Sequence, residues 1–481
     1  MEMVAAASPA AQTLRTMNTH CTTSIAHHHS AIVKNPTPWL FNKPGILTLY
    51  ASNPIPRRQT NVLTLLTRCS TKPDINTNSE IGQNSASADE PGSTPNPEHL
   101  PTAKLGDDDS LSSSSSLSLP CSSRGLVFDL GPSGSWDSRD IGSPVVKRFL
   151  SDDEERWYMW YHGSSGQNPG SDSLGLAVSS NGIHWERGFG PVRSAADVGL
   201  VMNVGQDWWS FDTLSIRPGE VVVMSSSKVK ASSAVYWLYY TGLNSEKVDL
   251  GADDGDKGEV FSRSLPGLAI SQDGRYWARI EGDHHSGALF DVGSDGEWDS
   301  LFIAGPQVVF HGSGDLRMYY HSFDVKSKQF CIGMARSRDG IKWVKLGKVL
   351  GGGKVGGFDE LGAVNASVIK NKKDGNYVMA YEGVDGDGKR SIGIAVSSDG
   401  LREWRRVDEG DAVLRRGEEE DGWDNQGVGY PCLVQMEGGD VDGEWRLYYR
   451  GVGNGGRSGI GMAVSRGSDI SNFRKWTGFQ S

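Results

Sequence analysis

The most varied polar residues in this chain occupy one position of a phrase that the sequence repeats five times. Each of them directly precedes the Gly or Ser that ends an aromatic-rich hydrophobic run. The five residues at this position are His162, Thr241, His321, Glu382 and Arg450. Carboxyl and imidazole groups can transfer protons, and a guanidinium can hold a carboxylate or phosphate. A structural position tends to repeat its residue, so this variation beside a repeated Tyr predicts a ligand pocket, with a water-filled channel as the alternative.

The phrase that carries these residues also predicts the elements that position them. It begins at Trp157, Tyr236, Leu316, Tyr377 and Trp445, so successive copies start about 60 to 80 residues apart. A β-branched run precedes each aromatic run; a Gly-x-Ala-x-Ser run, usually an Asp-Gly or Asn-Gly turn, and a Trp follow it. The runs have the residue types of strands, and the turn suits a tight hairpin. Five copies predict an all-β, five-bladed β-propeller with four-stranded antiparallel blades and its ligand site at the central axis.

The starts of the predicted first strands hold a second set of candidate residues. First strands line the axis of a propeller, and an antiparallel hairpin places the end of the second strand beside the start of the first. The two sets are therefore expected to meet in one pocket. The second set comprises Asp140, Ser143, Arg217, Gly305, Glu360, Asn365, Asn425, Gln426 and Tyr430.

Residues that recur in every copy are expected to be scaffold. An aromatic-Asp pair opens each copy, and most of its carboxylates are expected to bond turn amides; they belong to Asp137, Asp212, Asp299, Asp359 and Asp424. The Trp residues that close the copies are expected to pack between blades, and they include Trp185, Trp277, Trp343 and Trp404. Residues 126–130 are predicted to complete the last blade, whose own outer strand is residues 475–479, so that no open edge remains.

The chain divides by composition into three parts. Residues 1–70 carry six basic residues and one acidic residue among many Ser, Thr, Ala and Asn. This composition resembles an organellar transit peptide and favours the chloroplast stroma over the mitochondrion, with a disordered tail as the alternative. Residues 71–123 are rich in Ser and acidic residues, which predicts a disordered linker. Residues 124–481 make the predicted propeller.

Charge and composition exclude several classes of partner. The net charge is −11, which is a poor match for nucleic acid or an anionic membrane surface. No run approaches the ~18–20 apolar residues of a transmembrane helix. Five Cys are too few for a disulfide framework and indicate a reducing compartment. His162 and His321 could hold a central cation, but the sequence shows no third ligand clustered with them. We therefore predict no metal or cofactor.

The same repeats resemble a known group of enzymes. First strands of the form WD…P-x-V, second strands such as RMYYHS and RLYYRG, and hairpins such as IGMARSRDGIKW are similar to those of the arabinanase/levansucrase/invertase superfamily of glycoside hydrolases, which includes families 43 and 32. The resemblance covers about residues 124–481. It implies hydrolysis or transfer of glycosyl units by three axial carboxylates. The family's Asp before the first-blade Pro is Ser143 here, and the equivalent Arg217 and Gly305 are not acids either.

Glycosidic cleavage needs two carboxyl groups that flank the bond, so other acids must reach the axis if this chain is active. We expect Asp140 to be the base or nucleophile and Asp212 the orienting acid. Glu382 is expected to be the general acid, with its pKa raised by a partly dry pocket, and Glu360 is the reserve acid. The predicted ligand-binding residues are His162, Arg217, His321, Asn365, Asn425, Tyr430 and Arg450.

Two functions are therefore favoured, and an enzyme with another chemistry on the same scaffold remains open as a third, because fold does not fix function. One is a glycosidase-like propeller that acts on or recognises a small-molecule or oligosaccharide ligand. The other is a catalytically inactive propeller that serves as a chloroplast binding or assembly factor with a protein partner. Ser143 at the family's acid position favours the second function, whereas the varied polar residues favour a retained small-molecule site.

Overall fold

The described residues of this protein, in a computed structural model, form an all-β body. They are residues 123–150, 154–224, 235–249, 260–312, 314–408, 411–437, 443–465 and 467–478. The predicted transit peptide (1–70) and, apart from Ser123, the predicted linker (71–123) lie outside them. No α-helix occurs in these ranges. The described residues therefore include no helix with the length and apolar character needed to cross a membrane.

Two four-stranded antiparallel sheets come first in the chain. Each follows chain order from its first to its fourth strand. The first sheet consists of β2 (Asp140–Leu150), β3 (Glu155–Ser164), β4 (Ser173–Ser179) and β5 (Gly199–Met202). The second consists of β6 (Ser215–Val223), β7 (Tyr236–Asp249), β8 (Val260–Ser271) and β9 (Ala278–Ile280).

The remaining strands repeat the same up-and-down order. One group is β10 (Ala304–Gly312), β11 (Asp315–Asp324), β12 (Gln329–Ser337) and β13 (Trp343–Leu350). The next is β14 (Gly362–Lys370), β15 (Tyr377–Val384), β16 (Arg390–Ser397) and β17 (Arg405–Arg406). A single parallel pairing of Phe330 with Gly362 links these two groups. The last group is β18 (Gly427–Gln435), β19 (Trp445–Val452), the short 3₁₀ turn η4 (Asn454–Gly456), β20 (Ser458–Ser465) and β21 (Phe473–Lys475).

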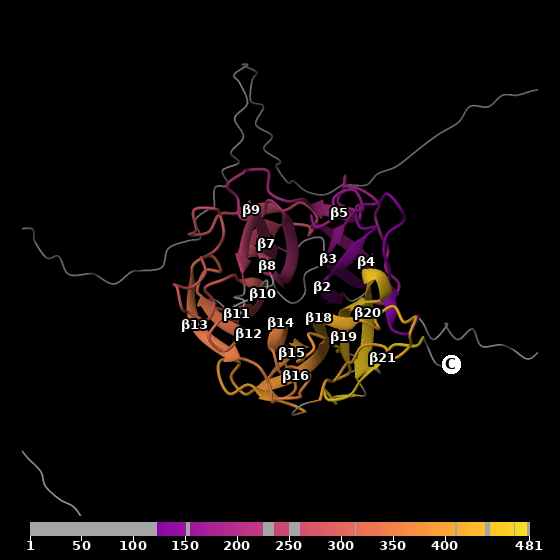
Figure 1. Ribbon diagram of the computed structural model, residues 1–481. Coiled ribbons are helices and arrows are strands. Elements are labelled where there is room, and N and C mark those ends of the chain that lie inside the picture. The colour runs from indigo at the N-terminus through magenta and orange to yellow at the C-terminus, as the bar shows by residue number, and fades with distance from the viewer. Residues whose placement is uncertain are drawn as a thin grey trace, which may run out of the picture. The chain divides into compact units, whose positions relative to one another are not determined.

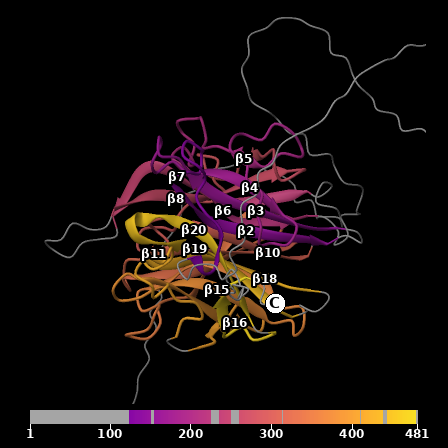
Figure 2. The same cartoon turned by 90° about the vertical axis from the view of Figure 1, so that its right-hand side faces the viewer.

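The groups lie around a common centre with their first strands innermost (Figure 1). Strands β2, β6, β10, β14 and β18 contact one another in a closed circuit, whereas β5, β9, β13 and β21 lie outside. In the perpendicular view, β2–β4 and β6–β8 lie on the side opposite β15 and β16 (Figure 2). This all-β arrangement of antiparallel sheets is consistent with a β-propeller.

The N-terminal strand closes the last sheet, as the sequence predicted. Strand β1 (Leu126–Phe128) pairs with β20, and β21 pairs with the same strand. The outer strand begins at Phe473, two residues before its predicted start, because Phe473 is already paired with Ser465. The backbone amide of Gly125 also donates to the carbonyl of Trp476 at 2.9 Å. The two ends of the described body are thus held by backbone hydrogen bonds to one sheet.

Each aromatic-Asp pair forms the same buried triad. The Asp carboxylate accepts a hydrogen bond of 2.9 to 3.2 Å from the repeated Tyr of the second strand, and it pairs with an Arg or Lys 2.6 to 3.4 Å away. Burial, and then the neighbouring carboxylate, raise the pKa of each Tyr, so the hydroxyl stays a donor. The triads are Asp137/Tyr161/Arg187, Asp212/Tyr240/Arg279, Asp299/Tyr320/Lys345, Asp359/Tyr381/Arg406 and Asp424/Tyr449/Lys475.

The aromatic residue of each pair covers the same Tyr. Ring centroids lie 5.2 to 5.9 Å apart in all five copies, a distance at which aromatic pairs attract. The ring also lies on the Gly of the third strand, since a Cβ on Gly333 would come within 2.2 Å of Trp298. The repeated Gly therefore makes room for the repeated aromatic ring.

The Trp residues that close the copies pack between successive groups, as predicted. Trp404 contacts Tyr319 of the preceding group, with ring centroids 5.8 Å apart. Trp343 contacts Tyr239 in the same way at 5.8 Å, and Trp185 contacts Tyr448 at 6.1 Å. These contacts form the hydrophobic core between neighbouring sheets.

We expect D359A to lower the free energy of unfolding by ~3–5 kcal/mol, because it leaves a buried hydroxyl and a guanidinium without their carboxylate. Y381F removes one hydrogen bond to the charged group but keeps the ion pair, so its loss should be ~1.5–3 kcal/mol. Urea denaturation of the full chain measures both. The control is D387N, whose side chain is 74% exposed, against 1% for Asp359. A loss in D359A no larger than that in D387N would contradict the structural role of the triad.

Candidate functional site

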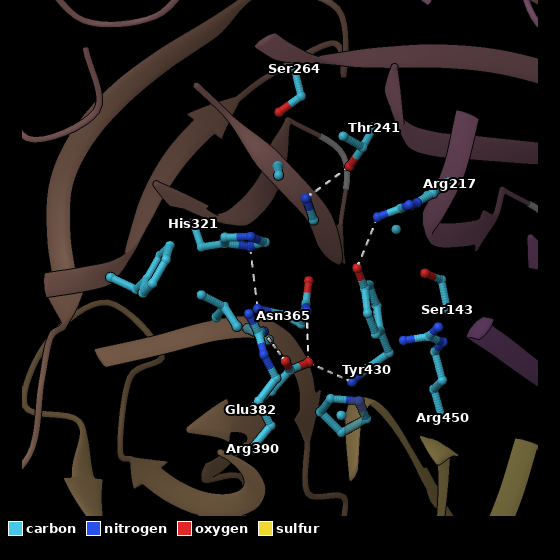
Figure 3. A pocket seen from close by; sticks show the side chains of 18 of the residues that line it. Ser143, Arg217, Thr241, Ser264, His321, Asn365, Glu382, Arg390, Tyr430 and Arg450 are labelled. Atoms are coloured by element: carbon cyan, nitrogen blue, oxygen red, sulfur yellow. Dashed lines mark hydrogen bonds and ion pairs between the residues drawn. The ribbon is translucent and has the colours of Figure 1, made fainter. Parts of the chain in front are cut away.

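A cavity of about 680 Å³ lies where the first strands begin (Figure 3). Both predicted sets of residues reach it. Its lining includes Ser143, Arg217, Gly305, Asn365 and Tyr430 from the first strands, and Thr241, His321, Glu382 and Arg450 from the ends of the second strands. The two sets meet because the ends of the second strands pair with the starts of the first; Glu382, for example, pairs with Val364.

Four of the first strands bulge at the residue that lines the cavity. The pairing of first and second strands shifts register at that residue in β2, β10, β14 and β18, whereas in β6 it shifts after Arg217, between Pro218 and Glu220. In the described chain, four of the five lining residues there have left-handed φ: Ser143 (47°), Gly305 (61°), Asn365 (49°) and Tyr430 (48°). A bulge re-aims a side chain, and a left-handed non-Gly residue costs ~1–3 kcal/mol. Strain of this kind concentrates at ligand sites, which supports a functional cavity.

Among the described residues that line the cavity, the acidic residue is Glu382, and its carboxylate is held in the ionised form. Its carboxylate accepts hydrogen bonds from Asn365 Nδ2 (2.8 Å) and the Tyr430 amide (2.9 Å), and it pairs with Arg390. Burial alone would raise the pKa of Glu382, but Arg390 and these hydrogen bonds lower it below its ordinary 4.5. The expectation of a raised pKa was wrong, because the Arg390 cation and two further hydrogen-bond donors outweigh desolvation.

His321 lies beside Glu382 as a neutral imidazole. Burial lowers the pKa of His321 to about 4, although Glu382 acts in the opposite direction. Its Nδ1 accepts a hydrogen bond from the Asn365 amide at 3.3 Å. The proton of this imidazole therefore resides on Nε2, which makes His321 a hydrogen-bond donor toward a ligand.

An arginine–carboxylate cluster, which we define as Asp140, His162, Asp172, Arg217 and Arg450, lies at another side of the cavity. Arg450 Nη2 donates to Asp140 Oδ1 and Arg217 Nε donates to Asp172 Oδ2, both at 2.7 Å. Burial alone would raise the pKa of both carboxyls; His162 and Arg450 lower that of Asp140, and Arg217 and His162 lower that of Asp172. Both carboxylates are thus ionised, and neither lines the cavity.

His162 lies behind the cavity wall. Its Nδ1 is 2.9 Å from Ser143 Oγ, and its Nε2 is buried, 3.7 Å from Asp140 Oδ2 and without a hydrogen bond. Asp140, His162 and Asp172 each offer one ligand atom within 4.8 Å of the others, and they are the described residues that could hold a metal ion. Arg217 and Arg450 already neutralise the carboxylates of Asp172 and Asp140, so a metal ion there would have to share both carboxylates with these arginines.

A third variable position reaches the same place, and the sequence reasoning missed it. It lies three residues before the Gly of each third strand and holds Asp172, Ser264, Phe330, Arg390 and Ser458. Ser264, Phe330 and Arg390 line the cavity, while Asp172 and Ser458 bond its charged wall. The start of the third strand adjoins the end of the second, as Arg390 does Val384. Extending the hairpin argument by one strand would have found all five residues.

Three further predicted residues do not reach the cavity. Asp212 is fully buried in its triad with Tyr240 and Arg279. Glu360 accepts a hydrogen bond from the Gly356 amide outside the lining. Asn425 donates to the carbonyl of Glu420 within its own loop. The predicted catalytic and ligand-binding residues that the structure does bring together in the cavity wall are Arg217, His321, Asn365, Glu382, Tyr430 and Arg450, with Ser143 beside them.

Comparison with known proteins gives relatives in sequence and in fold. No protein-family model matches the chain. Two curated relatives are uncharacterized proteins from two strains of Mycobacterium tuberculosis, each 28% identical over 349 residues, covering 71% of this chain and 97% of the relative. A thermostable family-43 glycoside hydrolase shares the fold with a TM-score of 0.50 and 17% identity over 74% of this chain and 98% of its own. A glycosyl hydrolase from Bacteroides ovatus matches with a TM-score of 0.47 and 16% identity over 73% of this chain and 93% of its own.

Lowering the pH should remove the stabilisation that ionised Glu382 provides. Because its pKa is lower in the folded protein than the ordinary 4.5, this contribution is complete above that value and is lost as the pH falls through the folded pKa. The difference in unfolding free energy between wild type and E382Q should therefore shrink as the pH is lowered from ~6 to ~3. Urea denaturation across this range measures it, and a constant or growing difference would contradict an ionised Glu382.

Replacing Gly305 tests the backbone of the cavity wall. Its φ is +61°, and a Cβ there would lie 3.0 Å from His321 Nδ1 and 3.2 Å from Asn365 Oδ1. Gly375 has φ +76° with nothing within 4 Å, so G375A should cost only the ~1–2 kcal/mol of left-handed strain. We expect G305A to lose more stability than G375A in thermal and urea unfolding. Equal losses of unfolding free energy would mean that His321 and Asn365 move aside at no cost.

Proposed function

We propose that this chain is a five-bladed, glycosidase-like β-propeller that acts on a carbohydrate held in the central cavity. The five sequence repeats, the five groups of strands and the closed circuit of first strands support five blades. Its location in the chloroplast stroma is part of this proposal and rests on the composition of residues 1–70.

The observation that carries the proposal is the convergence of the blade-specific polar residues on one cavity. The cavity volume of about 680 Å³ lies in the range of small-ligand sites and can take an oligosaccharide of a few rings. Its wall offers hydroxyl, amide, imidazole and carboxylate groups, which are the partners that sugar hydroxyls need. The shared fold with a family-43 glycoside hydrolase supports a carbohydrate as the ligand class.

The charge state of Glu382 assigns it a role within this proposal. An ionised carboxylate can accept a proton from water or attack an anomeric carbon, so Glu382 acts as base or nucleophile, not as general acid. Asp140 is the second acid candidate, but Arg450 and Ser458 hold it as a carboxylate. The leaving group would then take its proton from a neutral donor of the wall, such as Tyr430, or from water.

A second candidate is a propeller that binds its carbohydrate without cleaving it. Ser143 replaces the Asp of the resembling family, and its hydroxyl bonds to His162. Glu382 and Asp140, both ionised, leave the two-carboxyl mechanism without an acid partner. These two observations support recognition without hydrolysis as the second candidate.

Aryl glycosides and free oligosaccharides distinguish the two candidates. If the full chain is a hydrolase, E382Q should lower kcat/KM by ~10²–10⁴-fold with little change in substrate affinity, whereas E360Q should behave as wild type. Release of nitrophenol measures turnover, and calorimetry measures binding. Binding without turnover in the wild type would support the recognition candidate. The absence of both binding and turnover across a broad panel of sugars would overturn the proposal.

A further inference from the structure

The cavity is cationic although the chain is acidic. The net charge of the chain is −11, yet the charged residues in the described cavity lining are one acid, Glu382, and four cations. The four cations are Arg217, Lys247, Arg390 and Arg450. Arg390 is committed to Glu382 through their ion pair. Arg217 and Arg450 are also ion-paired, but their carboxylate partners do not line the cavity, so the surface of this part of the wall is positive. A cavity with low-dielectric walls concentrates such a field.

Two of these arginines are braced from behind and leave donors facing the cavity. Arg217 binds Asp172 through Nε, and Arg450 binds Asp140 through Nη2 and the Ile141 carbonyl through Nε. The two carboxylates do not line the cavity, so they fix the guanidiniums without occupying it. Arg217 Nη2 and Arg450 Nη1 make no hydrogen bond to the described residues. The Arg side chains are 34% and 22% exposed, respectively, and both line the cavity.

The two guanidiniums come from different sheets and converge. Arg217 lies on β6 and Arg450 on β19, while their carboxylate partners each place an oxygen within 4.8 Å of the other. Tyr430 Oη lies 3.2 Å from Arg217 Nη1 and adds a hydroxyl to the same wall. Figure 3 shows Arg217, Arg450, Ser143 and Tyr430 together on one side of the cavity, away from His321. Paired guanidiniums with a neighbouring hydroxyl are suited to a phosphate or carboxylate.

We propose that the carbohydrate carries an anionic group, a phosphate or a carboxylate, which binds Arg217 and Arg450 beside Tyr430. This inference rests on the proposed function, since it names the class of carbohydrate that the same cavity takes. The anionic group occupies the arginine side of the cavity, and the sugar ring reaches Glu382, Asn365 and His321 on the other side. A neutral sugar would use the two guanidiniums only as ordinary hydrogen-bond donors, without the charge-assisted bonds that a phosphate or carboxylate makes.

The test is calorimetry of the full chain at low salt with matched sets of ligands. Each set contains a neutral hexose, its 6-phosphate and its uronate, in the glucose, galactose and mannose series, together with inorganic phosphate alone. The phosphate or uronate of at least one set should bind at least tenfold more tightly than the neutral sugar, and its affinity should fall as salt is added. The derivative that binds more tightly than its neutral sugar, phosphate or uronate, identifies the anionic group.

Variants locate the group. R450Q and Y430F should each weaken binding of the anionic sugar more than binding of the neutral sugar, by ~10–100-fold for the arginine and less for the hydroxyl. Because R217Q leaves buried Asp172 unpaired, the double variant R217Q/D172N tests Arg217 with the charge balance kept. The control is R336Q, an exposed arginine paired with Asp315 far along β12 from its cavity end.

The outcomes separate this inference from the proposed function. Equal affinity for neutral and anionic sugars, or equal effects of R450Q on both, would overturn the inference and leave carbohydrate binding intact. Binding of inorganic phosphate without binding of any sugar phosphate or uronate would also overturn it. Absence of binding to every sugar, neutral or anionic, would instead overturn the proposed function itself.

Discussion

The structure depends on a buried carboxylate that joins three strands of one sheet. The Asp before each first strand accepts a hydrogen bond from the second-strand Tyr and pairs with a cation from the outer part of the same group, as Asp359 does with Tyr381 and Arg406. A buried charge is costly unless it is paired and hydrogen-bonded, so all three groups must be in place together. This constraint sets where each first strand enters, and therefore where its bulge and its lining residue come to lie.

The rigid scaffold allows strained backbone and a buried charge in the cavity wall. Ser143, Asn365 and Tyr430 hold left-handed backbone that an isolated chain would avoid, and Glu382 holds a negative charge away from water. Such strain persists only where the surrounding packing overdetermines it. Here the repeated triads and the Trp contacts between sheets supply that packing. The wall can then differ from one copy to the next, and the arginine–carboxylate cluster on one side and Glu382 with His321 on the other arise from that freedom.

Much of the candidate site could be predicted from the sequence, because the repeat separates invariant from variable positions. The position of Thr241, His321, Glu382 and Arg450 reaches the cavity, and so does the first-strand position of Ser143, Arg217, Gly305, Asn365 and Tyr430. Asp172 and Arg390 were missed, since the hairpin argument stopped one strand early. The protonation of Glu382 could not be foreseen either, because it depends on Arg390 and on the Tyr430 amide from another sheet. Proximity between sheets leaves no mark on local pattern.

By itself the sequence determined the all-β architecture, the order of strands in each group and the closure of the last sheet by β1. These follow from residue types and periodicity, which act over a few residues and recur in every copy. Only the tertiary structure decided which acids meet the cavity, which are braced by arginines and which, like Asp212, are enclosed in the scaffold. The physical reason is that charge state and access are set by neighbours from other strands, brought within hydrogen-bond distance only when the sheets assemble around a common centre.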